Sequence, residues 1–284
     1  MFHDPAVVSQ LKASVPVKVE DKSFFAPYSA LPLRVPDHVE PMDRADFLGI
    51  TFSVGSHEQW LTQMFAPRNE SFEFLVTPNV DHFVRLSQEP DALAAYQRAD
   101  WCMCDSQIID LLAGLQNTDL MAYPGADLVR DMLNDPRSAN RTIAVVGPQP
   151  KYFERLRQRF PNAGLMFVEA PMMQPGCTEW QKTIERIEQT NADLTLLCLS
   201  FPKQEFMARD LKDRNLTNGR AICCGASVDF LTGRQKRAPK AMRQLRLEWL
   251  YRLLSNPRRL WRRYLVVGPR IFAMFLKDQR NRKG

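Results

Sequence analysis

The stretch RTIAVVGPQPKYFERLRQRF, residues 141–160, sets the pattern that decides the fold. Residues 142–146 form a short apolar run with the length of a buried strand, and this run ends at a Gly-Pro turn. Residues 151–160 then alternate apolar and basic side chains with the spacing of an amphipathic helix. We therefore predict a strand, a turn and a helix in this order.

The same alternation runs through most of the chain. Six further apolar runs predict strands: FLGITFSV (47–54), FEFLVT (72–77), DWCMCD (100–105), GLMFVEA (164–170), ADLTLLCLS (192–200) and RAICCG (220–225). The stretches between them predict helices at residues 56–65, 81–87, 91–99, 106–115, 125–135, 178–190 and 203–211. Such alternation favours an α/β fold, with a mostly parallel sheet and helices on both of its faces.

Composition divides the chain into three parts. Residues 1–45 carry six prolines and weak periodicity, which predicts an extended and partly disordered leader. A chain of 284 residues with 45% hydrophobic composition is long enough for one sizeable core plus an appendage. We expect residues 46–233 to form this core and residues 234–284 to form a basic C-terminal appendage.

The positive charge lies almost wholly in the appendage. Residues 234–284 hold 16 Lys and Arg against 2 Asp and Glu, whereas the preceding residues hold 22 basic and 30 acidic side chains. A basic segment of this density favours an anionic partner. Nucleic acid, a membrane surface and a phosphorylated substrate all fit that description.

Arginine is interleaved with large apolar residues in NPRRLWRRYLVVGPRIFAMFL, residues 256–276. Asn256 and Pro257 fit the N-cap and the first position of a helix. Its apolar stripe consists of Leu260, Trp261, Tyr264 and Leu265. This pattern favours the headgroup boundary of a membrane, where rings insert and guanidinium groups meet phosphate. The alternative is that the apolar residues pack on the core and the arginines are simply solvated.

Cysteine usage and the N-terminus bear on the compartment. The six cysteines show no CxxC or metal-ligand spacing, and most lie in apolar runs, which predicts buried reduced thiols and a cytoplasmic location. The N-terminus lacks a signal-peptide pattern, and no apolar stretch reaches the roughly 18 residues of a membrane span. We therefore expect the chain to lie on a membrane surface and not to cross it.

Polar residues or glycine follow several of the predicted strands. Thr77 and Asn79, Asp105, Gly147 and Ser200 all stand at such strand ends. The carboxyl ends of parallel strands share one edge of the sheet, and ligands bind at that edge. The sequence thus predicts a crevice there. The alternative for Thr77, for Asn79 and for the pair Asp105-Ser106 is helix capping, which needs the same residue types.

Longer elements carry a family resemblance. They are, in order, FLGITF, VTPNVDHFV, ADWCMCD, YPGADLV, IAVVGPQP, FPKQE, AICCGASVDFLTG and the segment RAPKAMRQLRLEWLYRLLSNPRRLWRRYL. Through them, residues 47–276 resemble the WecG/TagA/CpsF family of bacterial glycosyltransferases, glycosyltransferase family 26. Members transfer N-acetylmannosamine or its uronic acid to polyprenyl-diphosphate-linked sugars. The resemblance implies a Rossmann-like core, a UDP-sugar donor, no metal or other cofactor, and an appendage that completes the active site at the membrane.

The resemblance also implies roles for individual residues. Asp105 corresponds to the proposed general base, and Thr77 and Asn79 correspond to the lining of the sugar pocket. The nucleotide and sugar side is expected to include Gly125, Gly147, Gln204 and Asp229. Three appendage arginines associated with catalysis fall, by spacing, on Arg252, Arg259 and Arg262.

The chemistry of sugar transfer is compatible with these residues. One carboxylate that deprotonates the attacking hydroxyl predicts inversion of the anomeric carbon. No D-x-D pair stands at a strand end, so arginines or helix N-termini are expected to stabilise the leaving diphosphate without a metal. Offsets of 7 and 10 place Arg252, Arg259 and Arg262 within about 80° of one helical face, provided that the helices on either side of Pro257 run nearly coaxially.

The sequence departs from the family pattern at two points. Ser106 follows the strand-end aspartate where members usually carry glycine. Ala122 and Tyr123 stand where members usually carry a sugar-site arginine. The lost guanidinium leaves the identity of the donor sugar open.

We therefore expect an inverting, metal-independent hexosyltransferase of surface or exopolysaccharide biosynthesis. Its hexose is N-acetylmannosamine-like, the corresponding uronic acid, or glucose, and its place is the inner face of the cell membrane. Two other functions stay open, a membrane-docked scaffold of weak activity and a nucleic-acid-binding protein. We expect no nucleic-acid partner, because the basic residues alternate with large aliphatics. Assembly of identical chains stays open.

Overall fold

The structure of the protein is a computed structural model. It describes residues 41–67, 71–214, 219–239, 241–242, 245 and 247–283, and of Arg259, Arg282 and Lys283 it describes the backbone only. Residues 1–40 of the leader expected at residues 1–45 lie outside the described part of the chain.

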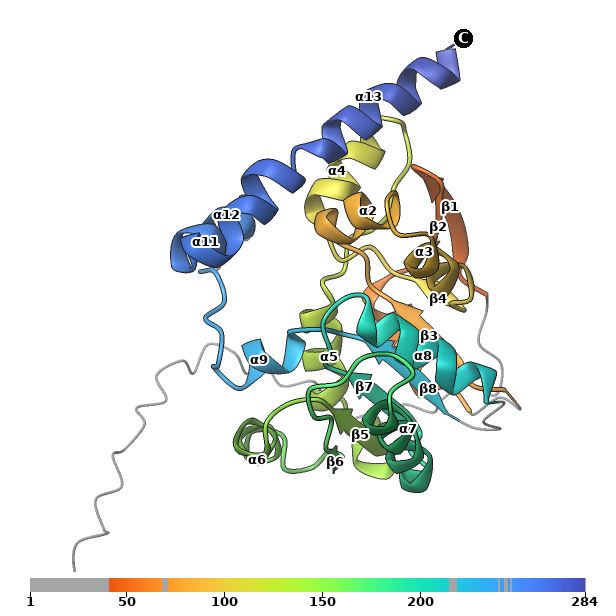
Figure 1. Cartoon of the computed structure of the whole chain (residues 1–284), viewed down its shortest axis with the longest axis vertical. Coiled ribbons are helices and arrows are strands. Elements are labelled where there is room, and N and C mark those ends of the chain that lie inside the picture. The colour runs from red at the N-terminus through yellow and green to blue at the C-terminus, as the bar shows by residue number, and fades with distance from the viewer. Residues whose placement is uncertain are drawn as a thin grey trace, which may run out of the picture. The chain divides into compact units, whose positions relative to one another are not determined.

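The core is built on a parallel sheet of six strands (Figure 1). The strands are β3 (Glu73–Val76), β4 (Trp101–Cys102), β5 (Thr142–Val146), β6 (Gly164–Val168), β7 (Leu194–Leu197) and β8 (Arg220–Cys223). Their spatial order is β4-β3-β8-β7-β5-β6. Val146 pairs with Leu197, and Leu197 pairs with Cys223, so neighbouring strands end at the same level. The prediction of a Rossmann-like α/β core is confirmed.

Helices cover both faces of the sheet because successive strand residues point to opposite sides. On β3, Phe74 and Val76 enter one apolar cluster and Leu75 enters the other. The cluster around Phe74 receives α2 (Val80–Leu86), α3 (Pro90–Gln97), α4 (Gln107–Gly114), α7 (Thr178–Thr190) and α8 (Lys203–Asp213). The cluster around Leu75 receives α1 (His57–Phe65), α5 (Gly125–Asn134), α6 (Pro150–Arg159) and α9 (Ser227–Leu231).

The prediction of a single strand at residues 47–54 is wrong. This stretch belongs to an antiparallel hairpin of β1 (Asp43–Phe47) and β2 (Ile50–Val54). Leu48 and Gly49 form its turn with φ values of 50° and 79°. Positive φ at both positions suits a tight hairpin turn, so the apolar run is interrupted there. Phe47 and Phe52 are fully buried, which explains why the whole run looks like one strand.

The appendage consists of α11 (Glu248–Ser255), α12 (Pro257–Trp261), the π-helical turn η3 (Arg262–Val267) and α13 (Arg270–Lys283). The expectation of nearly coaxial helices is wrong. Residues 249 and 264 would lie about 22 Å apart along one continuous helix. The rings of Trp249 and Tyr264 instead lie 6.2 Å apart, so the chain turns back at Asn256. Arg252 and Arg262 therefore do not share one helical face.

Asn256 and Pro257 occupy the predicted positions at the start of α12. The side chain of Asn256 makes no capping hydrogen bond, however. The proline alone fits this helix start without loss, because the first helical position needs no N–H donor.

The appendage packs on the core through only part of its apolar surface. Ile271 and Phe275 of α13 are buried, and the ring of Phe275 lies 6.3 Å from that of Phe47. Gln116 Nε2 also donates a 3.1 Å hydrogen bond to Asp278. The alternative that the apolar residues of the appendage pack on the core is thus confirmed for Ile271 and Phe275.

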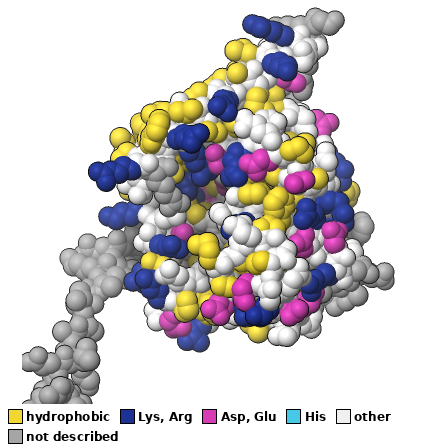
Figure 2. Space-filling model, viewed as in Figure 1, with side chains coloured by type: hydrophobic (Ala, Val, Ile, Leu, Met, Phe, Trp, Pro, Cys, Tyr) yellow, Lys and Arg dark blue, Asp and Glu magenta, His cyan; other side chains and the backbone are white. Residues whose placement is uncertain are grey.

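Several of the other large apolar side chains of the appendage are exposed, and Figure 2 shows hydrophobic and basic side chains along this stretch. The exposed ones are Leu245, Leu254, Trp261, Leu265, Val266, Phe272 and Leu276. Within the described part of the chain, none of the helices combines the length and apolar character of a membrane span.

Candidate active site

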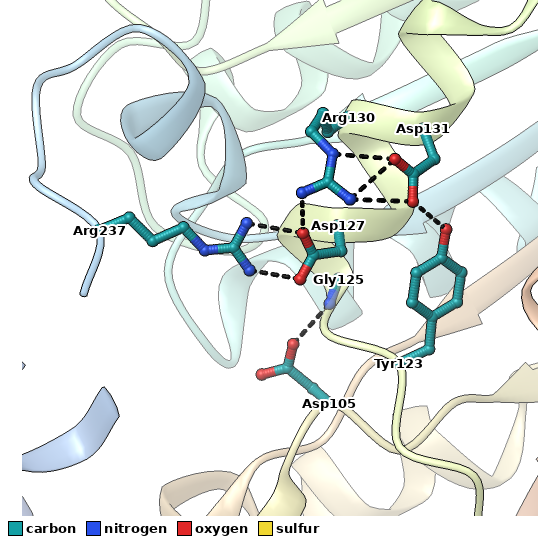
Figure 3. Close-up of polar contacts among 7 residues, drawn as sticks. All are labelled: Asp105, Tyr123, Gly125, Asp127, Arg130, Asp131 and Arg237. Atoms are coloured by element: carbon teal, nitrogen blue, oxygen red, sulfur yellow. Dashed lines mark hydrogen bonds and ion pairs between the residues drawn. The ribbon is translucent and has the colours of Figure 1, made fainter. Parts of the chain in front are cut away.

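Asp105 follows β4 at the carboxyl edge of the sheet. Its Oδ1 accepts a 2.6 Å hydrogen bond from the backbone N–H of Gly125, the first residue of α5 (Figure 3). Its own N–H donates to the carbonyl of Pro78 at 3.3 Å. Oδ2 has no hydrogen-bond partner among the described residues. The carboxyl group is thereby oriented with one oxygen held and the other available.

The electrostatic surroundings of Asp105 suit a base that works near neutral pH. Burial raises its pKa from 3.8 to about 7, and the charge of Glu248 adds to this rise. The hydrogen bond from Gly125 and the charges of Arg252 and Arg237 oppose it. A base with a pKa near the working pH combines a deprotonated population with real basicity.

Thr77 and Asp105 converge on Gly125. A Cβ atom added to Gly125 would lie 3.4 Å from Thr77 Oγ1 and 3.5 Å from Asp105 Oδ1. Thr77 is buried, and its hydroxyl donates a 2.8 Å hydrogen bond to the carbonyl of Cys223 on β8. The hydroxyl is thus fixed at the junction of β3 and β8, beside the carboxyl group.

Asn79 and Ser106 cap the helices that begin at this edge. Asn79 Oδ1 accepts from the N–H groups of Asp81 at 3.1 Å and His82 at 3.3 Å, and so caps α2. Ser106 Oγ accepts from Ile109 at 3.4 Å at the start of α4. The capping interpretation is therefore confirmed for both, and it keeps the amide of Asn79 next to Thr77.

The turns after β8, β7 and β5 continue this edge of the sheet beyond β3. Gly147 has a φ of 104°, and an added Cβ would lie 2.9 Å from Leu199 Cδ2 and 3.1 Å from the carbonyl oxygen of Cys198. Glycine is therefore required at this close approach. Gln204 is buried, and its Oε1 accepts a 2.8 Å hydrogen bond from Gly225 N–H. Its amide thus holds the backbone that follows β8.

Asp229 lies on α9 and is held within the chain. It accepts a 3.0 Å hydrogen bond from Gln235 Nε2 and forms an ion pair of 3.2 Å with Arg234. Gly147, Gln204 and Asp229 thus follow β5, β7 and β8 in turn, and these three strands are neighbours in the sheet.

The structure places Arg252, one of the three predicted arginines, against Phe230 of α9. The guanidinium of Arg252 lies 4.7 Å from the ring centroid of Phe230, and its charge lowers the pKa of Asp105. Arg262 is exposed and has no ion pair with any residue that the structure describes. Arg259 lies in α12, and its side chain is outside the described part of the chain.

Two guanidinium groups near Gly125 were missed by the sequence reasoning. Arg237 donates to Asp127 Oδ1 at 2.7 Å and to its Oδ2 at 2.5 Å, and Arg130 donates to the same carboxylate (Figure 3). Tyr123 is buried, and its hydroxyl donates to Asp131 at 2.8 Å. A cation thus lies near Gly125 although Tyr123 replaces the expected arginine. The RAPKAM element, which begins at Arg237, was the available signal.

Within the described ranges, no group of three or more His, Cys, Asp or Glu side chains is arranged to hold a metal ion. The carboxyl group of Asp105 and the hydroxyl of Thr77 converge at Gly125, and the charges of Arg252 and Arg237 act on the same carboxyl group. They suit proton transfer and the binding of an anionic ligand.

A parallel sheet that gathers a carboxylate, a hydroxyl group and tight glycine turns at its carboxyl edge is typical of Rossmann-like enzymes. Residues 45–284 match the Glycosyl transferase WecG/TagA/CpsF family, and the chain belongs to this family. A similar protein is the N-acetylglucosaminyldiphosphoundecaprenol N-acetyl-beta-D-mannosaminyltransferase of Bacillus spizizenii. It is 27% identical over 248 residues, which cover 85% of this chain and 92% of the relative. The protein is a glycosyltransferase, and the resemblance seen in its sequence is confirmed.

Proposed function

We propose that this glycosyltransferase moves a hexose from a UDP-sugar to a polyprenyl-diphosphate-linked glycan, with inversion and without a metal ion. The hexose is N-acetylmannosamine-like, its uronic acid or glucose, and the product serves surface or exopolysaccharide biosynthesis. The name of the Bacillus relative supports the acceptor class and the first of these sugars. Tyr123 is buried where an arginine was expected, so the other sugars stay in the proposal.

Asp105 is the proposed general base. Its free Oδ2 takes the proton of the acceptor hydroxyl while that oxygen attacks the anomeric carbon. The new glycosidic C–O bond forms as the bond from the anomeric carbon to the diphosphate oxygen breaks, and UDP leaves with the electron pair. Attack from the face opposite the leaving group inverts the anomeric centre.

Arg252 is the proposed stabiliser of the leaving diphosphate. A fixed guanidinium at a partly desolvated site stabilises charge that develops in the transition state. The influence of Arg252 on the pKa of Asp105 supports this role, because a charge must lie near the carboxyl group to exert it. Arg259 and Arg262 stay candidates for the same task.

The proposed place of action is the inner membrane surface. Exposed Trp261, Leu265, Phe272 and Leu276 provide apolar groups for the headgroup boundary, and the appendage supplies basic residues beside them. Each basic residue near an anionic surface contributes about 1 kcal/mol, so a few of them hold the enzyme reversibly. The lipid-linked acceptor is confined to that surface.

The observation that carries the proposal is the carboxyl group of Asp105 at the edge of the sheet, with Oδ1 held by Gly125 N–H and Oδ2 without a hydrogen-bond partner among the described residues. The test is to incubate the purified protein with a polyprenyl-diphosphate-linked N-acetylglucosamine and a panel of UDP-sugars, with and without EDTA. We expect one added hexose by mass, an inverted anomeric configuration by NMR, and no effect of EDTA. Absence of transfer from every UDP-sugar would contradict the donor class. Retention of the anomeric configuration would contradict inversion, and loss of activity in EDTA would contradict metal independence.

A further inference from the structure

Arg263 connects the appendage to the predicted sugar pocket. From η3, its Nη2 donates a 3.2 Å hydrogen bond to Asn79 Oδ1, and its Nε lies 3.4 Å from Asp81 Oδ2. The side chains of Arg263 and Asp81 are 32% and 16% exposed, so the contact is partly shielded from solvent. One guanidinium thus bridges two side chains at the start of α2.

The contact fixes which way the amide of Asn79 points. Its Oδ1 receives the N–H groups of Asp81 and His82 as well as the guanidinium of Arg263. All three are donors, so the oxygen and not the nitrogen must face them. The nitrogen Nδ2 has no partner among the residues that the structure describes. Asn79 therefore offers a hydrogen-bond donor to a ligand.

A π-helical turn sets the register of Arg263. The carbonyl of Arg263 accepts from Gly268 N–H at 2.8 Å, an i to i+5 hydrogen bond. Such wide turns change the direction of the side chains along a helix and are frequent at functional sites. Arg263 is half-buried against α2, whereas its neighbour Arg262 is exposed.

We infer that Arg263 is a positioning residue for the donor sugar. It locks Asn79 with its NH2 group toward an oxygen of the sugar, either a hydroxyl or an acetyl carbonyl. The same contact fastens the appendage, which carries Arg252, to the core. This inference rests on the proposed function and adds Arg263, one of the arginines in the stretch 256–276, to the residues of the site.

A guanidinium suits this role better than an ammonium group. The planar fork reaches an amide oxygen and a carboxylate at the same time, whereas lysine offers one compact charge. Arg263→Lys is therefore expected to preserve the ion pair with Asp81 and to lose part of the hold on Asn79.

The experiment compares Arg263→Ala and Arg263→Lys in two backgrounds, the wild type and Asn79→Ser. Serine keeps an oxygen for capping α2 but lacks the NH2 donor. The assay uses the UDP-sugar that the wild type transfers, and it separates kcat, the KM for the donor and the KM for the acceptor. Arg98→Ala, which breaks a surface ion pair with Asp213, is the matched control.

We expect Arg263→Ala to raise the donor KM about tenfold, as the loss of a charge-assisted hydrogen bond does. The acceptor KM stays the same, Arg263→Lys falls between, and the control matches the wild type. In the Asn79→Ser background, Arg263→Ala has no further effect on the donor KM.

An unchanged donor KM would overturn the inference. So would the same loss in both backgrounds, because Arg263 would then only brace the appendage. Thermal unfolding checks that each variant is folded, and Arg263→Lys carries the test if the alanine variant does not fold. A wild type that transfers no sugar from any UDP-sugar fails at the earlier step, the proposed function, and the inference falls with it.

Discussion

The carboxyl edge of the sheet and the appendage are held in place by different interactions. At the edge, backbone groups fix the polar side chains: Gly125 N–H holds Asp105, the carbonyl of Cys223 holds Thr77, and Gly225 N–H holds Gln204. The appendage is held mainly by side chains, among them Ile271 and Phe275. A hydrogen bond to a backbone group survives most substitutions of the residue that provides this group. A contact between two side chains, in contrast, is lost when either residue is substituted.

This difference assigns separate tasks to the two regions. The edge carries Asp105, the proposed base, whose orientation is set by the fold of the core. The appendage supplies Arg252, whose position depends on a few contacts between α11 to α13 and the core. We therefore expect changes at the edge to affect chemistry while the fold stays intact, and changes in the appendage to have graded effects on docking, charge stabilisation and membrane binding.

The largest effect is expected from Asp105→Asn. Removal of a general base lowers the transfer rate about 10²- to 10⁴-fold, while the amide oxygen still accepts from Gly125 and preserves the local fold. The measurement is UDP release with the lipid-linked acceptor. Asp213→Asn, at a surface ion pair, is the control. A rate within twofold of the wild type would remove Asp105 from the mechanism.

The next largest effect separates the buried from the exposed side of α13. Phe275→Ala, or Ile271→Ala, is expected to lower the free energy of unfolding by about 3 kcal/mol, because each empties a buried site. Phe272→Ala with Leu276→Ala is expected to leave unfolding unchanged and to weaken binding to anionic vesicles about tenfold. Thermal unfolding and vesicle co-sedimentation measure the two effects. Equal behaviour of the two pairs would contradict the division of this helix.

A smaller effect on rate is expected from Arg252. Arg252→Ala removes one preorganised cation and should lower kcat about 10- to 100-fold, and Arg252→Lys should recover part of the loss. Single-turnover assays in detergent exclude any contribution from membrane binding. The control is again Arg98→Ala. If kcat does not change, the leaving diphosphate is stabilised elsewhere.

The last effect concerns stability and its dependence on pH. Burial raises the pKa of Asp105 to about 7, so the folded state holds a proton that the unfolded state has lost above pH 3.8. The wild type therefore loses stability as pH rises between these values. Asp105→Asn avoids this loss and should be more stable by up to about 4 kcal/mol at pH 8, with no difference below pH 4. A constant difference at all pH values would exclude this cause.

Much of the core could be predicted because its signals are local. The apolar runs that became β3 to β8, and the polar residues after them, depend on side-chain alternation and on the rule that ligands bind at the carboxyl edge. Asp105 and Thr77 were therefore placed at one edge correctly, whereas Gly125 was named only through the family resemblance. The 47–54 run was misread because the turn at Leu48 and Gly49 requires positive φ, which apolar composition does not reveal.

The appendage was harder to predict because its geometry depends on contacts distant in sequence. The reversal at Asn256 separates Arg252 from Arg262, although their spacing suits one helical face. Arg237 and Arg263 find their partners Asp127 and Asn79 only in the folded chain. Composition showed that the segment is basic, but it did not show which arginine faces the core.

The most direct test of the shared site is the titration of Asp105 itself. Carbon-13 NMR of aspartate-labelled protein would follow its carboxyl carbon in the wild type, in Arg252→Gln and in the control Arg98→Gln. We predict a midpoint near pH 7 in the wild type and the control, and a higher midpoint in Arg252→Gln, because the cation of the appendage lowers this pKa. A wild-type midpoint near 4, or no shift in Arg252→Gln, would contradict the account that base and cation form one site.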